Sequence, residues 1–457
     1  MKKKHVDMLS GSVMRGLLAL TMPVMIMNVA QSLFTLADTA LLKAFGHATA
    51  VGAAGAVGTL QTVFTHVISG VSVGAGVVIA RNLGAKRRAD AERAISTGFI
   101  LAIAIGLTLL IGGSLLARPL LLLTNCSEVL LPEATTYFRI YFYGAPILAV
   151  YSLAAGALRA IGDTRRPMRI LFIGCSAKLV LSVLLLSLTG KGVESAALST
   201  LLANLIKMVL SLAALLRSRE VVTVNLTRPV FDGPALRATL YNGLPPTIQT
   251  VLYSLANVVL LSVVNTFGPD ATTGISIANQ YDGVIYNLIH APSLAVIPYI
   301  AQNIGAGDTG RAKQAMRCGM LIGVGFGLTF GSFSALFAPQ LAGLLATSTA
   351  ARDFAVQKMI IISSTYFICG INEVLGGTLK GMGRTIPPSV TSLIYMCAFR
   401  FVWVYGIFPL VPNLTFLYLV WPISWILCIV TQIPFLRRAL RALEKKKMAV
   451  PSGAAVD

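Results

Sequence analysis

The sequence predicts an all-α polytopic membrane protein: twelve transmembrane helices in two repeat-related six-helix lobes, with both termini cytoplasmic. Three observations support this fold class. Of 457 residues, 56% are hydrophobic and 12% are charged, and the mean hydropathy is +0.78, whereas about a quarter of the residues in a soluble domain are charged. Long apolar segments recur along the chain, and its two halves resemble one another. We therefore expect a monomeric, multi-pass protein of the cytoplasmic (inner) membrane.

Twelve segments are long and apolar enough to cross a membrane. A spanning helix needs about 20 predominantly apolar residues, and the windows that meet this requirement lie at 16–42, 51–80, 94–116, 134–157, 168–189, 193–216, 238–264, 272–301, 316–338, 354–379, 387–409 and 414–436. An even number of spans places both termini on one side. No short apolar stretch with a small-residue cleavage site follows the basic N-terminus, so a cleaved signal peptide is not expected.

The basic residues between the spans indicate which side is cytoplasmic. Of 37 Lys and Arg, 28 fall in connections on the N-terminal side, and four fall on the opposite side: Lys43, Arg118, Lys191 and Arg352. Cytoplasmic loops hold the positive excess, so both termini are predicted to be cytoplasmic. The net charge of +20 is thus a topology signal. Nucleic-acid binding is not expected, because the basic residues occupy short loops without interleaved aromatic residues.

An internal repeat divides the chain into two predicted lobes, 1–228 and 229–457. At an offset of 221, IARNLGAKRRADAERAISTG aligns with IAQNIGAGDTGRAKQAMRCG, and GALRAIGDTRRP aligns with GTLKGMGRTIPP. Both motifs fall in predicted cytoplasmic loops, so the repeat preserves orientation. Parallel repeats are a transporter design in which the substrate site lies between the halves and access alternates as they rock. The alternative is that the halves only form a stable membrane scaffold.

Several stretches carry a family resemblance that covers most of the chain. They are LTMPVMIMNVAQSLFTLADTALL, ARNLGAKRRADAERA, LRAIGDTRRPM, GVESAALST, AQNIGAGDTGRAKQA, NEVLGGTLKGMGRTIPP, RFVWVY and WPISW. Through them the sequence resembles the multidrug and toxic compound extrusion (MATE) family of cation-coupled exporters. The resemblance implies a twelve-helix, V-shaped antiporter with a central cavity, which exports cationic or amphiphilic compounds as H⁺ or Na⁺ moves inward. It also implies that Pro23 and Asp38, in the first span, take part in coupling.

Asp38 is the single ionisable residue of SLFTLADTALL. An intramembrane carboxylate is costly and faces a cavity or a partner. Counted from Lys43 at 1.5 Å per helical residue, Asp38 lies about 8 Å below the outer edge of the span. It either holds a proton or a Na⁺ ion, or simply reaches water or Lys43 by itself. Pro23 bends the same helix, as a hinge or as an ordinary kink.

The fifth span departs from the family pattern. Asp-bearing relatives show an Asn followed four residues later by an Asp, whereas this chain has Lys178 and Ser182. Lys178 lies near the midplane and must snorkel outward to reach Asp38, so direct pairing stays open. If the two pair, the ammonium replaces the coupling cation, Na⁺ binding is disfavoured, and proton-driven release of Lys178 is the expected mechanism.

Seven further polar residues are candidates for lining a cavity or binding substrate: Gln61, Lys207, Asn279, Asp282, Tyr286, His290 and Arg400. Those of the eighth span share one helix face, and Gln61 begins a similar face in the second span. The two faces either form walls of a wet central cavity or supply hydrogen bonds between helices.

Depth along the spans sorts the remaining charges. Asp282 and Arg400 lie at depths that let them meet. Glu373 is either a second proton site or a partner of His290 or of basic loop residues. Arg139 and Lys358 lie within about a turn of the outer ends of their spans, where we expect snorkelling anchors.

Enzyme chemistry is not indicated. HExxH and acidic metal-binding motifs are absent, and GAGDTG follows no strand, so it is not a nucleotide-binding loop. The six cysteines are dispersed and indicate neither disulfides nor a zinc site. No cofactor is expected beyond a transported H⁺ or Na⁺. We predict an exporter of a small-molecule substrate; a flippase for lipid-linked sugars is the alternative, because Lys178, Lys207 and Arg400 suit an anionic headgroup.

Overall fold

The computed structural model describes residues 5–45, 48–124, 126–189, 192–225, 229–346 and 348–448. Every regular element in these ranges is helical. Nine of the described helices are long and apolar enough to cross a membrane, or eleven spans if each bent helix pair forms one. The prediction of an all-α polytopic membrane protein is confirmed. The exact count of twelve spans and the cytoplasmic position of the termini stay predictions.

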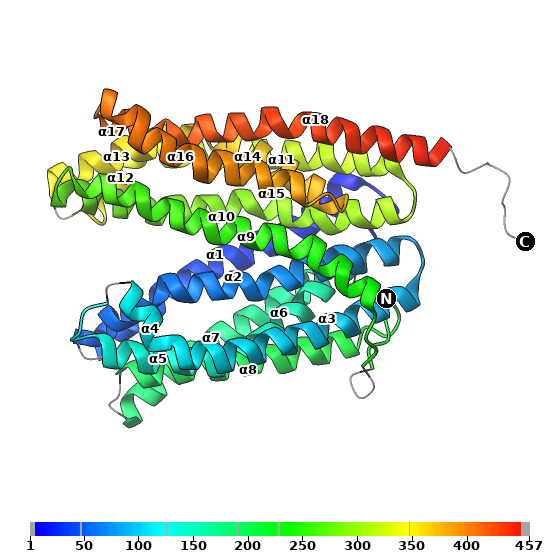
Figure 1. The fold of residues 1–457 in the computed structure, drawn as a ribbon, viewed down its shortest axis with the longest axis horizontal. Helices are drawn as coiled ribbons and strands as arrows, with labels where there is room; N and C mark the ends of the chain where they lie inside the picture. Colours follow the sequence, from blue (N-terminus) through cyan, green and yellow to red (C-terminus); the bar gives the residue numbers. More distant parts are fainter. Residues whose placement is uncertain are drawn as a thin grey trace, which may run out of the picture. The chain divides into compact units, whose positions relative to one another are not determined.

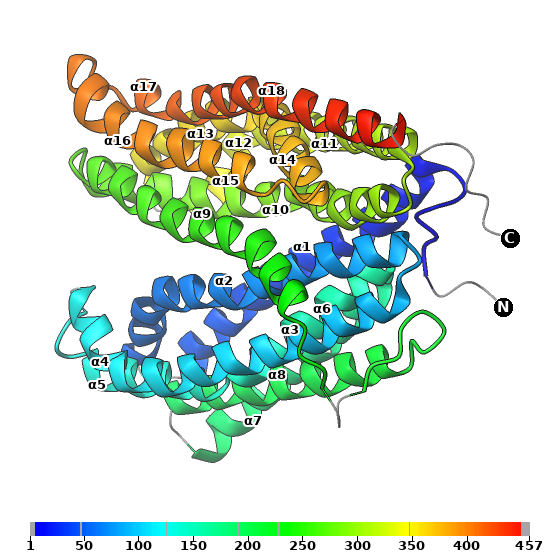
Figure 2. The same ribbon diagram turned by 45° about the vertical axis from the view of Figure 1, so that its right-hand side comes forward.

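The helices form two compact units, and the first contains Ile26–Leu83 and Arg87–Thr247. It consists of the end of α1 (Val13–Phe45), α2 (Ala48–Gly84), α3 (Arg88–Thr108), α4 (Ser114–Leu123), α5 (Leu131–Tyr143), α6 (Ala145–Ile161), α7 (Arg165–Thr189), α8 (Gly192–Leu216) and the start of α9 (Gly233–Asn265). The helix α8 packs against α6 and α7 (Figure 2). A π-helical turn at Leu109–Gly113 joins α3 to α4 as one long span.

The second unit begins with Val6–Met25 and continues from Ile248. Its helices are the rest of α9, then α10 (Pro269–Gly305), α11 (Thr309–Leu336), α12 (Ala338–Gly343), α13 (Thr349–Ser364), α14 (Tyr366–Gly381), α15 (Ile386–Leu393), α16 (Phe399–Val402), α17 (Leu414–Tyr418) and α18 (Val420–Met448). Figure 1 shows α10, α11 and α14 lying side by side, with α18 against α14. The helices α13 and α14 meet at a bend of 50°.

Glycines bring helices equally close in both units. A Cβ atom on Gly106 would lie 2.5 Å from the Cα atom of Pro146, and one on Gly327 would lie 2.5 Å from the Cα atom of Phe367. The two pairs are equivalent at the offset of 221. Small residues allow membrane helices to approach this closely. The internal repeat is therefore also a repeat of helix packing.

Arg311 and Asn303 fix the segment before α1 to the second unit, and Asn303 donates to the Met8 carbonyl oxygen at 3.0 Å. The Arg311 guanidinium donates hydrogen bonds to the carbonyl oxygens of Met8, Ser10 and Gly11, at 3.0, 2.5 and 2.8 Å. Met8 itself is fully buried in an apolar cluster of this unit. Compact units and sequence repeats are different divisions of a chain, so the predicted lobe boundary at residue 228 stays a prediction.

Candidate functional site

Asp38 on α1 forms an ion pair with Lys178 on α7. The Lys178 ammonium lies 2.7 Å from Asp38 Oδ2, and the two side chains are 14% and 24% exposed for Asp38 and Lys178 respectively. Ser182, one turn along α7, donates to Asp38 Oδ1 at 3.5 Å. The pairing that the sequence left open is therefore present. The other partner considered, Lys43, has its side chain outside the described part of the structure.

Lys207 on α8 lies in the same unit as this pair. Its ammonium is 5.0 Å from the centre of the Tyr151 ring, a cation–π distance. Gly174 on α7 leaves room for the lysine stem, since a Cβ atom there would lie 2.3 Å from Lys207 Cγ. No acidic side chain pairs with Lys207 within the described ranges.

The polar face of α2 is used for contacts between helices. Thr65 donates to the Gln61 carbonyl oxygen at 2.8 Å, and the Tyr141 hydroxyl group lies within hydrogen-bond distance of both oxygens, 2.9 Å from the Thr65 hydroxyl and 3.3 Å from the Gln61 carbonyl. Ser72 donates to the carbonyl oxygen of Ser152 on α6 at 2.6 Å. These bonds favour the interhelical alternative for this face. A cavity role of the Gln61 side chain stays a prediction.

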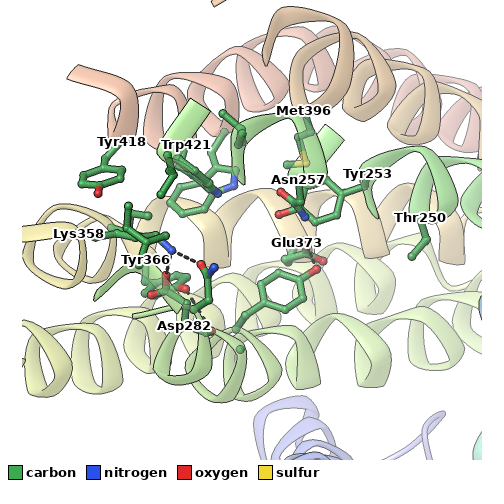
Figure 3. A pocket seen from close by; sticks show the side chains of 18 of the residues that line it. Thr250, Tyr253, Asn257, Asp282, Lys358, Tyr366, Glu373, Met396, Tyr418 and Trp421 are labelled. Carbon is green, nitrogen blue, oxygen red and sulfur yellow. Dashed lines mark hydrogen bonds and ion pairs between the residues drawn. The ribbon is translucent and has the colours of Figure 1, made fainter. Parts of the chain in front are cut away.

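A cavity of about 370 Å³ lies within the second unit (Figure 3). Its polar lining consists of Gln249, Thr250, Asn257, Asn279, Asp282, Lys358 and Glu373. Its aromatic lining consists of Tyr253, Tyr286, Tyr366, Tyr418, Trp421 and Trp425. Sites for small organic molecules have volumes of about 300–1,000 Å³ and mainly apolar walls with a few polar groups. The cavity therefore suits part of an aromatic or amphiphilic molecule.

Lys358 on α13 is not a snorkelling anchor, contrary to the prediction. Its ammonium lies 3.0 Å from Asp282 Oδ2, donates to Asn279 Oδ1, and is 5.7 Å from the centre of the Trp421 ring. Figure 3 shows this side chain pointing at Asp282. Depth along a helix does not say which face carries the residue, and Lys358 faces α10 with 2% of its side chain exposed. Arg139, the other expected anchor, is exposed.

Arg400 on α16 does not meet Asp282, contrary to the expectation from depth. Its Nη1 donates to Asn257 Oδ1 at 2.9 Å, and its guanidinium carbon lies 4.9 Å from the ring centre of Tyr253 and 5.1 Å from that of Trp421. Two π-helical turns, Ile394–Ala398 and Trp403–Ile407, flank this short helix. Each wide turn rotates the side chains that follow it, so a count along a regular α-helix misplaces Arg400.

Glu373 on α14 binds His290 on α10. His290 Nδ1 lies 2.8 Å from Glu373 Oε2, and the Tyr286 hydroxyl donates to Glu373 Oε1 at 3.2 Å. One turn along α10 from His290, Ser293 donates to the Glu373 carbonyl oxygen at 2.9 Å. Of the partners considered for Glu373, the structure therefore supplies His290. A proton-carrying role stays a prediction.

Pro23 lies inside α1, close to the point where that helix passes from one compact unit to the other. The second unit includes the helix up to Met25, and the first unit includes it from Ile26. Proline removes a backbone hydrogen bond and bends a helix. The position is the one that a hinge requires, and the hinge itself stays a prediction.

Of the aromatic residues that line the cavity, the sequence predicted Tyr286 and missed the others. Gln249, Tyr253, Asn257, Leu260 and Val264 follow one another at intervals of three or four residues along α9 and all line the cavity. That spacing marks one helix face, so this part of the wall was detectable. The aromatic residues of α17 and α18 carry no such signal, because they stand among apolar neighbours.

These features define a class: a multi-pass, helical membrane transporter with two repeat-related halves and buried ion pairs inside its spans. The family model MatE matches residues 23–184 and again residues 245–405, once in each half. The chain therefore belongs to the MATE family, whose members are membrane transporters. The prediction from the sequence motifs is confirmed.

Known relatives and solved structures match along most of the chain. It is 25% identical over 389 residues to the probable multidrug resistance protein YoeA of Bacillus subtilis, covering 84% of each chain. It is 26% identical over 405 residues to the FAD transporter of Shewanella oneidensis, covering 86% of this chain and 87% of the relative. The crystal structure of MATE in complex with MaL6 matches with a TM-score of 0.89 at 22% identity, covering 97% of this chain and 100% of that one.

Proposed function

We propose that the protein is a secondary active exporter, an antiporter that moves cationic or amphiphilic organic compounds out across the cytoplasmic membrane as protons move inward. Membership of the MATE family and the likeness to YoeA support export of small organic compounds. The observation that carries the coupling mechanism is the ion pair of Asp38 with Lys178. No resident cofactor is part of the proposal, because the coupling ion is itself transported.

Asp38 is the proposed coupling carboxylate, and Lys178 takes the place of a coupling cation. When a proton binds Asp38, the charge that holds the ammonium disappears and Lys178 is released. When the proton leaves, the pair forms again. A Na⁺ ion would have to displace a tethered ammonium that already lies 2.7 Å from the carboxylate. Protons are therefore the favoured coupling ion.

Proton binding must also change which side of the membrane the substrate site faces. We assign this to rocking of the two halves, the mode of access typical of parallel repeats. Pro23 lies between the anchored start of α1 and Asp38, so a hinge there would let release of Lys178 act on the direction of this helix. Glu373, paired with His290 in the other half, is a candidate for a second proton site.

Transport into proteoliposomes under separately imposed gradients of H⁺ and Na⁺ tests this proposal. Wild-type protein is expected to respond to the H⁺ gradient. In Lys178→Asn the carboxylate is free to bind a metal cation, so the response is expected to shift toward Na⁺. Lys313→Asn, which removes a lysine from a pair with Glu444 outside both sites, is the matched control. An unchanged ion profile in Lys178→Asn would contradict the substitution of Lys178 for the cation.

A flippase for lipid-linked or otherwise anionic headgroup substrates is the second candidate. The observation that favours it is the presence of Lys207 and Arg400, two intramembrane cations without an acidic partner in the described ranges. The similarity to a protein named as an FAD transporter also connects this family with a substrate other than a drug. Transport of a soluble dye against its gradient favours the exporter, whereas movement of a labelled lipid alone favours the flippase.

A further inference from the structure

The carboxylates around the cavity of the second unit are already paired. Asp282 holds Lys358 at 3.0 Å and Glu373 holds His290 at 2.8 Å. Arg400 pairs with no acidic residue in the part of the chain that the structure describes. Arg400 is therefore a cation beside the cavity that no carboxylate contacts among the described residues, and this suits a ligand group with a negative charge.

Arg400 presents an unoccupied pair of donors. Its side chain is 1% exposed, and Nη1 is bound to Asn257, but Nε and Nη2 have no hydrogen-bond partner among the described residues. These two nitrogens form one edge of the guanidinium group, the fork that binds a carboxylate or phosphate through two parallel hydrogen bonds. A buried ionisable group inside a membrane marks a substrate path by default.

Arg400 lies directly behind one wall of the cavity. Three residues that contact it, Tyr253, Asn257 and Trp421, line the cavity, and Figure 3 shows them along one side of it. Asn257 both lines the cavity and accepts from the guanidinium, so we expect an anion to reach the free nitrogens when that side chain turns aside.

We propose that Arg400 binds the carboxylate or phosphate group of a substrate whose aromatic or amphiphilic body lies in this cavity against Tyr253 and Trp421. The proposal rests on the transport function proposed above. Of the two substrate classes named there it selects the amphiphilic one, narrows it to molecules that carry an anionic group, and excludes purely cationic compounds from this site.

A surplus cation on an aromatic ring recurs in the other half. Lys207 lies 5.0 Å from the centre of the Tyr151 ring and has no acidic partner in the described ranges, while Asp38 of the same unit is held by Lys178. Each unit thus contains an ion pair of an aspartate with a lysine and, apart from it, a cation on an aromatic ring. This second case is independent support for an anionic substrate, because none of its residues lines the cavity beside Arg400.

Binding to purified, detergent-solubilised protein tests the site apart from transport. Fluorescein and rhodamine 123 share a xanthene ring system and carry opposite charge, and fluorescence polarisation measures the affinity of each. Wild-type protein is expected to bind fluorescein more tightly. Arg400→Gln is expected to lose about tenfold or more in fluorescein affinity, since each hydrogen bond to a charged group contributes about 1.5–3 kcal/mol. Arg400→Lys, which keeps the charge without the fork, is expected to recover part of the loss.

Asn257→Asp supplies the missing anion from within the protein. It is expected to abolish fluorescein binding and to raise the melting temperature, so it tests the site even if Arg400→Gln fails to fold. Gln357→Glu adds the same charge to the same half outside the cavity and is the control. Tighter binding of rhodamine 123 than of fluorescein by wild-type protein, or unchanged fluorescein binding in both Arg400→Gln and Asn257→Asp, would overturn the proposal.

The source of the anion is decided by competition with dihexanoylphosphatidylglycerol. If this lipid binds more tightly than fluorescein, the anionic group belongs to a lipid headgroup, and if it binds more weakly, the group belongs to a soluble aromatic anion. Both results uphold the site at Arg400. Fluorescein binding without proton-driven transport would retain the site and reject the proposed exporter function instead.

Discussion

The two halves of the molecule pack their helices in the same way and place different charges inside them. Ser72 donates to the carbonyl oxygen of Ser152 at 2.6 Å, and the equivalent Ser293 donates to that of Glu373 at 2.9 Å. Both residues of the second bond lie 221 positions after those of the first. Bonds to the backbone survive changes in the accepting side chain, so the duplicated framework persists while its side chains diverge.

The aspartates inside the spans do not repeat, although the basic residues Lys178 and Arg400 are equivalent at an offset of 222. At offsets of 221 or 222, Asp38 corresponds to Leu260, and Asp282 corresponds to Gln61. Each half nevertheless contains one aspartate held by one lysine, built from positions that are not equivalent. Both halves therefore place an aspartate–lysine pair inside their spans, at positions that the repeat does not relate.

The largest expected effect is the loss of proton-driven transport when the aspartate of the first half is replaced, because we assign coupling to that half. Asp38→Asn cannot take up a proton and is expected to abolish proton-driven transport in proteoliposomes. The protein is expected to stay folded, because Lys178 is 24% exposed and its long stem can carry the charge toward water. Asp90→Asn removes an exposed acid of a surface ion pair and is the matched control. Wild-type transport by Asp38→Asn would show that the first half does not contain the coupling site.

The next largest effect is expected on stability, because the lysine of the ion pair in the second half is more deeply buried than that in the first. Asp282→Asn leaves the Lys358 ammonium uncompensated with 2% of its side chain exposed, and breaking a buried pair on one side costs about 3–5 kcal/mol. Thermal unfolding in detergent is expected to show a larger loss than for Asp38→Asn. Replacing both Asp282 by Asn and Lys358 by Met removes the stranded charge and is expected to recover most of the loss. An equal loss for the two aspartate variants would mean that burial does not distinguish the pairs.

The sequence predicted whatever depends on hydropathy and spacing. The fold class, the repeat and the family followed from apolar windows and aligned motifs. The pair of Asp38 and Lys178 was a stated alternative, because Lys178 stands in the fifth span where Asp-bearing relatives of the family show an Asn. The predictions of fold class, repeat and family need no knowledge of which side chains contact one another. Irregular turns in the helices therefore do not affect them.

The predictions that failed depended on which way a side chain points. Lys358 was assigned to the membrane surface from its depth, but it faces α10 and Asp282. Arg400 was expected at a depth that lets it meet Asp282, on a count along one regular helix, but π-helical turns lie on both sides of α16. Such turns arise from tertiary packing, and a sequence read with a single period of 3.6 residues does not reveal them.

The smallest expected effect tests whether the shared framework is energetically equivalent in both halves. Gly106→Ala and Gly327→Ala each place a Cβ atom 2.5 Å from a backbone Cα atom of the neighbouring helix. Backbone cannot rotate away as a side chain can, so the helices must separate, at a cost of about 1–3 kcal/mol for overpacking. We expect similar decreases in melting temperature for the two variants.

Two further glycines control for the change of residue itself. A Cβ atom on Gly112 or Gly325 meets nothing within 4 Å among the described residues, so Gly112→Ala and Gly325→Ala are expected to leave the melting temperature unchanged or to raise it, since alanine restricts the unfolded chain. If Gly106→Ala is destabilising and Gly327→Ala is not, the second half can relax its α11–α14 contact, and the equivalence of the two frameworks fails. If both are destabilising to the same extent, the difference between the halves is confined to their polar side chains.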